Sequence, residues 1–200
     1  MSYRKSKSMF SIPKQFIAKR NRLFSYIGTT LLSVTGWRVE GEIPDMKKLL
    51  VVFAPHTSNW DFVYGMALVL SLKIKIYWLR KHTIFKKGFR RLLKSLGGIP
   101  VNRGDSKNII KDITAFANQE GGFLIGLSPE GTRKRVENWK SGFLRMANSL
   151  ECPILLVGID YPSKVIKFTD LFYPTGDNQR DIDYLKKYYK DFIGKIPEYF

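Results

Sequence analysis

The chain has 200 residues and a mass of 23.2 kDa, which suits one domain with a substantial core. Its 34 lysines and arginines against 17 acidic residues give a formal net charge of +17, which favours anionic partners such as lipid, nucleic acid or an acidic carrier or substrate. A single cysteine excludes an internal disulfide framework and a thiolate-rich metal site, and any imidazole chemistry must use His56 or His82.

The first 38 residues combine basic charge with an apolar stripe. They contain eight Lys or Arg and no acid. Apolar side chains recur there at helical spacing, namely Ile17, Phe24, Ile27, Leu31 and Val34. This pattern predicts a basic amphipathic helix in a membrane interface, and the alternative is a helix packed on the domain with a solvated basic flank. We expect residues 1–38 to form this segment and residues 39–200 to form the main domain.

The longest uncharged run, residues 23–37, has fifteen residues. A bilayer span needs about 20 apolar residues, so the run is too short to cross a membrane. A long basic lead-in containing Pro13, with no clear small-residue cleavage site, also argues against a secretory signal. We therefore expect a peripheral or monotopic protein on the cytoplasmic face of the membrane.

Beyond this segment, short apolar runs alternate with helical patterns. Strands are predicted over residues 49–54, 74–78, 99–101, 123–127, 153–159 and 164–168, and helices over residues 60–72, 85–96, 108–119, 143–150 and 182–192. Strands separated by helices predict an α/β fold, in which a single domain has a mostly parallel or mixed sheet flanked by helices.

The first cluster of chemically active side chains is residues 55–62, which follow the strand predicted over residues 49–54. His56 lies in the loop, and Asp61 lies in the first turn of the next helix. Across a strand-to-helix turn the two side chains are able to face each other. A neutral imidazole is a good general base near neutral pH, and an adjacent carboxylate fixes its tautomer and stabilises the imidazolium.

The second cluster, residues 128–133, directly follows the strand predicted over residues 123–127. Gly131 allows a tight turn, Thr132 offers a hydroxyl, and Arg133 offers a planar fork suited to phosphate oxygens. Glu130 is able to orient that arginine or to bind a substrate hydroxyl. The structural alternative is a surface turn held by an ion pair.

Two further segments lie beside predicted strands. Arg103 follows the short strand at 99–101 and is flanked by Gly104, and residues 152–158 form an apolar strand opened by a proline. Residues 126–131 have the spacing G-x-S-x-x-G, whereas a nucleophile elbow requires G-x-S-x-G. This spacing disfavours a serine hydrolase.

Together, four blocks resemble the glycerophospholipid acyltransferase family, of the lysophosphatidate (1-acyl-glycerol-3-phosphate) acyltransferase type. The H-x-x-x-x-D block resembles residues 56–61, and the lysine-containing block that ends in G-G-x-x-x-x-R resembles residues 81–103. The E-G-T-R block is present at residues 130–133, and the proline-led apolar block resembles residues 152–158. The blocks occur in family order over about half the chain.

The resemblance implies transfer of a fatty acyl group from a thioester, acyl-CoA or acyl carrier protein, to a hydroxyl of a lysophospholipid. It implies that His56 and Asp61 are catalytic without an acyl-enzyme and that Lys81 stabilises the oxyanion. The acceptor's phosphate and glycerol would be held by Arg103, Glu130, Gly131, Thr132 and Arg133. Neither a metal nor another resident cofactor is implied.

The expected partners are a lysolipid acceptor, an acyl-CoA or acyl carrier protein, and an anionic membrane surface. Residues 62–103 contain ten Lys or Arg and no acid, which predicts either a solvated face or a cationic surface for headgroups or an acidic donor. Pro55 stands where the family often has Asn, and Trp60 precedes Asp61, so a different lysolipid, such as a lyso-aminolipid, is an alternative acceptor.

Two alternatives come from other classes of protein. A lipid hydrolase would use the same His–Asp pair on water, and a basic nucleic-acid-binding module would use the net charge. No nucleic-acid partner is expected, because the sequence has no zinc finger, aromatic RNA-binding signature or basic-zipper heptads.

Overall fold

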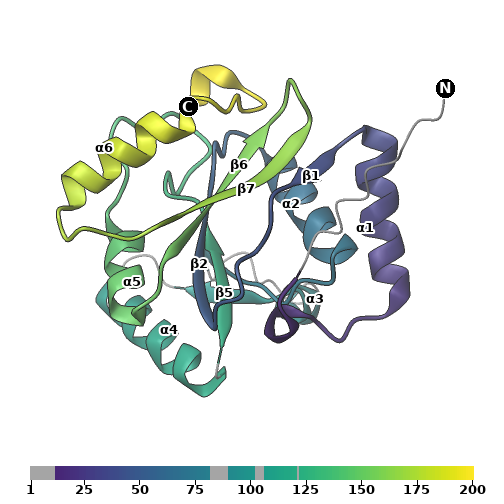
Figure 1. Ribbon diagram of the computed structural model, residues 1–200, viewed down its shortest axis with the longest axis horizontal. Helices are drawn as coiled ribbons and strands as arrows, with labels where there is room; N and C mark the ends of the chain where they lie inside the picture. Colours follow the sequence, from purple (N-terminus) through teal and green to yellow (C-terminus); the bar gives the residue numbers. More distant parts are fainter. Residues whose placement is uncertain (1–11, 82–89, 102–105, 121) are drawn as a thin grey trace.

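The computed structural model describes residues 12–81, 90–101, 106–120 and 122–200. Within these residues the chain forms a seven-stranded sheet of order β1-β7-β6-β2-β5-β3-β4 (Figure 1). The strands are β1 (Arg38–Glu40), β2 (Lys48–Ala54), β3 (Tyr77–Lys81), β4 (Gly98–Val101), β5 (Phe123–Leu127), β6 (Ile154–Asp160) and β7 (Val165–Phe172). Neighbouring strands pair in parallel except β6 and β7, which are antiparallel. The predicted single-domain α/β fold with a mixed sheet is therefore confirmed.

Helices cover both faces of the sheet. They are α1 (Arg22–Thr35), α2 (Asn59–Ser71), α3 (Arg90–Ser95), α4 (Ser106–Glu120), α5 (Gly142–Leu150) and α6 (Asn178–Tyr189), with 3₁₀ turns at Lys14–Phe16 and Pro197–Tyr199. Helices α1 and α2 pack on one face, and α4, α5 and α6 pack on the other (Figure 1). The sheet is thus the middle layer of a three-layer domain.

The central strand β2 shows why the sequence carries continuous apolar runs. Leu50 and Val52 belong to the core shared with α4, α5 and α6, whereas Leu49 and Val51 belong to the core shared with α1 and α2. All four side chains are buried. A strand with helices on both faces has no solvent-facing side, so its sequence does not alternate between apolar and polar residues.

Helix α1 packs closely against α2. A Cβ on Gly28 would lie 2.4 Å from the carbonyl oxygen of Ala67, so only glycine allows this approach. The Ser25 hydroxyl donates a hydrogen bond of 2.8 Å to the carbonyl oxygen of Ser71, and Leu32 is buried in the interface. No helix in the described ranges combines the length and apolar character needed to cross a bilayer.

The outer side of α1 remains apolar and exposed. The exposed side chains include Leu23, Phe24, Ile27 and Val34, with exposed fractions from 41% to 76%. The structure therefore shows that one face of the N-terminal helix packs on the domain, while the neighbouring apolar face is open to solvent; the membrane-interface role stays a prediction.

Some element boundaries differ from those predicted. Strand β3 begins at Tyr77 rather than at residue 74, because residues 73–75 pair with the N-terminal segment: Ile17 forms an antiparallel bridge with Ile74, and the Lys75 N–H donates to the Phe16 carbonyl. Of the helix predicted over residues 85–96, residues 90–95 form α3, and residues 85–89 lie outside the described residues.

Candidate active site

Three loops converge at the carboxyl edge of the sheet. Strands β5, β2 and β6 are adjacent and parallel, so the loops that follow them meet at one edge. His56 follows β2, Glu130 follows β5, and Tyr161 follows β6. This edge is where α/β sheets commonly place ligand-binding side chains.

A capping box places the Asp61 carboxylate. Ser58 is the N-cap of α2. Its side chain accepts a hydrogen bond from the helix backbone, and the Asp61 carboxylate in the first turn accepts one from the N-cap N–H. The Oδ2 atom of Asp61 accepts from the backbone N–H groups of Thr57 and Ser58, each at 2.8 Å. The Asp61 side chain is fully buried. The loop geometry therefore fixes the orientation of this carboxylate before any substrate is present.

The His56 imidazole lies directly against that carboxylate. Its Nδ1 atom is 3.1 Å from Asp61 Oδ2, and the His56 side chain is 19% exposed. The Phe53 ring meets the imidazole at a steep angle, with the ring centres 5.3 Å apart. Because Nδ1 faces Asp61, Nε2 is the nitrogen that is left to face a substrate. The structure thus brings the two predicted catalytic residues together.

Tyr161 contacts the other oxygen of the same carboxylate. The Tyr161 hydroxyl donates a hydrogen bond of 2.6 Å to Asp61 Oδ1. Burial, together with the hydrogen bond to Asp61 and its charge, raises the pKa of Tyr161, so the phenol remains a proton donor at neutral pH. The sequence analysis did not find this residue, because it lies 100 positions from Asp61 and outside the H-x-x-x-x-D spacing.

Glu130 joins the loop after β5 to the loop after β2. Its Oε1 atom accepts a hydrogen bond of 2.9 Å from the His56 backbone N–H, and Oε2 accepts one from the Ser128 hydroxyl. Burial raises the pKa of Glu130, partly offset by the hydrogen bonds from Ser128 and His56. The sequence analysis assigned this carboxylate to an arginine or a substrate hydroxyl, whereas in the structure it holds the backbone of the histidine loop.

Gly131, Thr132 and Arg133 of the second cluster lie at the surface. Gly131 has a φ of +65°, which supports the tight turn expected there, and Thr132 and Arg133 are exposed. A guanidinium nitrogen of Arg133 donates a hydrogen bond to the side-chain oxygen of Asn59, the first residue of α2. Arg133 is therefore anchored to Asn59, which lies three residues after His56 in the chain. The other N–H donors of its guanidinium are open to a ligand.

Of two further predicted site residues, one lies at the end of a described range and the other lies outside the described residues. Lys81 is the last residue of β3, where its backbone is in register with Val101 of β4. Arg103 lies outside the described residues.

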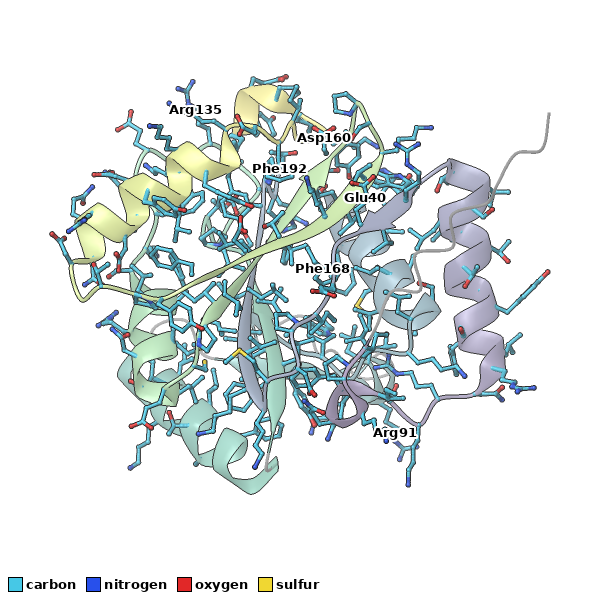
Figure 2. The ribbon with its side chains drawn as sticks, in the orientation of Figure 1. Glu40, Arg91, Arg135, Asp160, Phe168 and Phe192 are labelled. Carbon is cyan, nitrogen blue, oxygen red and sulfur yellow. The ribbon has the colours of Figure 1, made fainter. Side chains whose placement is uncertain are left out.

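The C-terminal segment packs against the histidine loop. The Ile196 N–H donates a hydrogen bond of 3.2 Å to the Thr57 hydroxyl oxygen, and a Cβ on Gly194 would lie 2.7 Å from that oxygen. The Phe192 ring packs on Gly158 of β6, where a Cβ would meet a ring carbon at 2.0 Å (Figure 2). The contacts of Gly194 and Ile196 therefore pack the C-terminal segment against residues 55–58. The sequence analysis found no motif in the last ten residues and therefore did not include them in the site.

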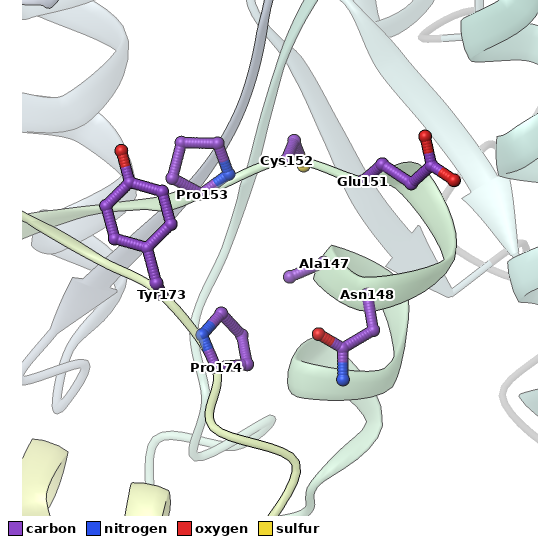
Figure 3. Close-up of a pocket in the computed structure, with 7 residues that line it drawn as sticks. All are labelled: Ala147, Asn148, Glu151, Cys152, Pro153, Tyr173 and Pro174. Carbon is purple, nitrogen blue, oxygen red and sulfur yellow. The ribbon is translucent and has the colours of Figure 1, made fainter.

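A shallow hollow lies at the other edge of the sheet. Its volume is about 260 Å³, and it lies where β6 begins and β7 ends, opposite the carboxyl edge that carries His56. Figure 3 shows the side chains that line it. The lining residues are Ala147, Asn148, Glu151, Cys152, Pro153, Tyr173 and Pro174. Burial raises the pKa of the Cys152 thiol to about 11, which keeps it protonated and unreactive at neutral pH. This hollow is separate from the candidate site.

The sequence model of the Acyltransferase family matches residues 36–160, a range that contains His56, Asp61, Glu130 and Arg133. The chain belongs to this family. It is therefore an acyltransferase, and the resemblance inferred from the four blocks is confirmed at the level of the family. Helix α1 and the C-terminal segment lie outside the matched range.

A solved structure shares the fold of this acyltransferase. The 1-acyl-sn-glycerophosphate (LPA) acyltransferase PlsC from Thermotoga maritima matches with a TM-score of 0.60 and 19% sequence identity, over 85% of this chain and 76% of that chain. At this identity the likeness is evidence of the fold. No curated protein matches the sequence.

Proposed function

We propose that this acyltransferase moves a fatty acyl group from a thioester of coenzyme A or acyl carrier protein to a hydroxyl of a lysophospholipid. The proposed acceptor is 1-acyl-glycerol-3-phosphate, and the product is then phosphatidic acid. The observation that carries the proposal is the His56 Nδ1–Asp61 Oδ2 contact of 3.1 Å beside the anchored guanidinium of Arg133. A base and a phosphate-binding group are what acylation of a lysophosphatidate requires.

The reaction proceeds by direct transfer. His56 Nε2 removes the proton of the acceptor hydroxyl, and the oxygen attacks the carbonyl carbon of the thioester to form a tetrahedral oxyanion. When this intermediate collapses, the carbon–sulfur bond breaks, and the leaving thiolate takes the proton from the imidazolium. Asp61 holds the Nδ1–H and stabilises the imidazolium between these steps. No acyl-enzyme and no resident cofactor take part.

Cationic and small residues of the second cluster bind the acceptor. The Arg133 guanidinium pairs with the phosphate, and Gly131 and Thr132 border the glycerol. Arg103 adds a second phosphate contact, and Lys81 stabilises the oxyanion; both roles follow from the family resemblance. Glu130 acts on the acceptor through the loop that it holds, since its oxygens bond the His56 backbone and Ser128.

We also propose that α1 docks the enzyme on an anionic membrane at the cytoplasmic face, as a peripheral or monotopic protein. At 100° per residue, Leu23, Ile27 and Val34 lie within an arc of about 40° on α1, and all three are exposed. Exposed Lys19 and Arg22 lie beside them in the chain. An apolar face with basic neighbours suits binding to anionic headgroups.

A product assay tests the proposed reaction. Purified protein is incubated with acyl-CoA or acyl carrier protein and with lysophosphatidate, another lysophospholipid or a lyso-aminolipid, and the lipids are identified by mass spectrometry. The expected result is phosphatidic acid from lysophosphatidate, with one thiol released for each diacyl product.

The same assay separates the alternatives. Release of free fatty acid without a diacyl product would contradict the proposal and indicate a hydrolase. Acylation of the lyso-aminolipid alone would contradict the acceptor assignment and the phosphate-binding role of Arg133.

A further inference from the structure

The Asp61 carboxylate receives its hydrogen bonds unequally on its two oxygens. Oδ2 accepts from the Thr57 and Ser58 N–H groups and faces His56 Nδ1, whereas Oδ1 accepts from the Tyr161 hydroxyl at 2.6 Å. Three of these donors belong to the loop and helix start around Asp61 itself. The fourth comes from the loop after β6, so replacing the Tyr161 side chain removes this contact without changing the loop around Asp61.

The Tyr161 side chain is itself held in place. Its backbone N–H donates a hydrogen bond of 3.0 Å to the Ile193 carbonyl, which ties it to the C-terminal segment. Its ring meets Trp37 edge-on, with centres 4.9 Å apart, and lies 6.2 Å from Tyr64. These contacts fix the ring, so the hydroxyl reaches Asp61 without a further loss of side-chain freedom.

We infer that Tyr161 is a positioning residue that sets the basicity of His56 by holding and partly neutralising the Asp61 carboxylate. This inference rests on the proposed function of the His–Asp pair. A donated O–H draws negative charge toward Oδ1 and so weakens the attraction between Oδ2 and an imidazolium at Nδ1. The hydroxyl also holds the carboxylate so that Oδ2 stays directed at Nδ1.

The direction of the effect follows from this arrangement. Without the Tyr161 hydroxyl, the carboxylate keeps more negative charge for its contact with Nδ1, so the charged form of the His56 imidazole is favoured. The carboxylate is also held less firmly. Among the described residues, the ionisable groups that face His56 or its partner are Asp61 from α2, Glu130 from the loop after β5, and Tyr161 with Tyr64 close to it. All except Tyr161 are unchanged in the variant, so their contributions cancel in the comparison.

The test uses Tyr161→Phe, which keeps the ring and removes the hydroxyl. The matched control is Tyr64→Phe, the same change in the neighbouring ring of the same cluster. The imidazole ¹⁵N shifts of His56 are followed as a function of pH in the full chain. With two histidines in the sequence, His82→Gln assigns the His56 resonances. Steady-state kinetics then give kcat and both KM values.

In Tyr161→Phe the imidazolium form of His56 is expected to persist to a higher pH than in the wild type. We also expect kcat to fall about tenfold, with little change in either KM. Tyr64→Phe is expected to match the wild type in the His56 titration, in kcat and in both KM values. As a second variant, 3-fluorotyrosine at position 161 provides a more acidic hydroxyl, and the imidazolium form of His56 is then expected to be lost at a lower pH than in the wild type.

An unchanged His56 titration in Tyr161→Phe and in the fluorotyrosine protein would overturn the inference, as would an equal effect of Tyr64→Phe. The titration needs no substrate, so it stands apart from the proposed function. If the titration shifts as expected but the wild type acylates no lysolipid, then the positioning role is supported and the proposed reaction is contradicted.

Discussion

Replacing Asp61 by Asn removes a charge and leaves the shape of the site almost unchanged. With the amide oxygen in place of Oδ2, the Thr57 and Ser58 N–H groups keep an acceptor. The amide nitrogen then faces the Tyr161 hydroxyl, which is able to turn and accept. The change therefore leaves few buried polar groups unpaired, and we expect the Asp61→Asn protein to fold.

The catalytic effect is expected to be much larger than the effect on folding. His56 Nδ1 would meet a neutral amide, which neither stabilises the imidazolium nor fixes its tautomer as a carboxylate does. The corresponding change in a serine protease lowers kcat about 10⁴-fold, so we expect kcat/KM to fall about 10³–10⁴-fold here, or about 4–5 kcal/mol of transition-state stabilisation. The free energy of unfolding should fall by about 1–3 kcal/mol, the scale of a hydrogen bond to a charged group.

Initial rates of diacyl product and urea unfolding measure these two effects on the same protein. The matched control is Asp177→Asn, because Asp177 also caps a helix and accepts from the N–H groups of Gln179 and Arg180, far along the chain from the site. That control should lose stability without losing activity. A kcat/KM for Asp61→Asn within tenfold of the wild type would refute the reasoning.

Three further changes test other parts of the account. Arg133→Ala should raise the KM for lysophosphatidate about tenfold or more and leave the KM for the acyl donor unchanged, because we propose that the anchored guanidinium pairs with the acceptor's phosphate. Glu130→Gln should gain stability relative to the wild type as the pH rises above the ordinary glutamate pKa. Burial raises the pKa of Glu130 in the folded chain above its value in the unfolded chain. The wild type therefore loses free energy of unfolding as the pH rises through the folded-state pKa, whereas glutamine at this position does not titrate. Urea unfolding over a pH series measures the difference in the free energy of unfolding between the two proteins. Replacing both Leu23 and Ile27 by Ser should weaken binding to anionic vesicles about tenfold or more, because two exposed apolar side chains no longer enter the interface.

Each of these has an outcome that contradicts it. A change of KM confined to the donor would reverse the role of Arg133. A difference in unfolding free energy between Glu130→Gln and the wild type that stays constant or falls with pH would contradict the burial argument. The vesicle measurement is compared with Tyr184→Ser, which removes an exposed ring from α6 on the opposite face; equal binding by the two mutants would show that α1 does not dock.

Local patterns were sufficient to predict most of the fold. Strand β5 was predicted with its observed bounds, because a strand buried on both faces is a continuous apolar run bounded by Gly122 and a turn. Strand β1 was not predicted: Arg38 and Glu40 are exposed, and a three-residue edge strand carries no pattern. The order of the strands depends on pairing between distant segments, which periodicity does not report.

In the candidate site, too, contacts between residues close in sequence were predictable and contacts between distant residues were not. The pairing of His56 with Asp61 was predictable, because five positions along the chain cross one strand-to-helix turn and a capping box fixes the carboxylate. The contacts of Tyr161 and of the C-terminal segment were not, since they join positions about 100 or more residues apart. For Glu130 the residue was predicted but its partner was not, because the His56 backbone N–H that donates to its carboxylate is 74 positions away.

The central claim is that His56 removes the proton from a lysolipid hydroxyl during transfer from a thioester. The most direct measurement compares the rate of phosphatidic acid formation by the wild type and by His56→Ala, with acyl-CoA and lysophosphatidate and with the fold of both proteins checked by thermal unfolding. A loss of about 10²–10⁴-fold in a folded variant is predicted. Diacyl product formed at a rate near that of the wild type would contradict the account.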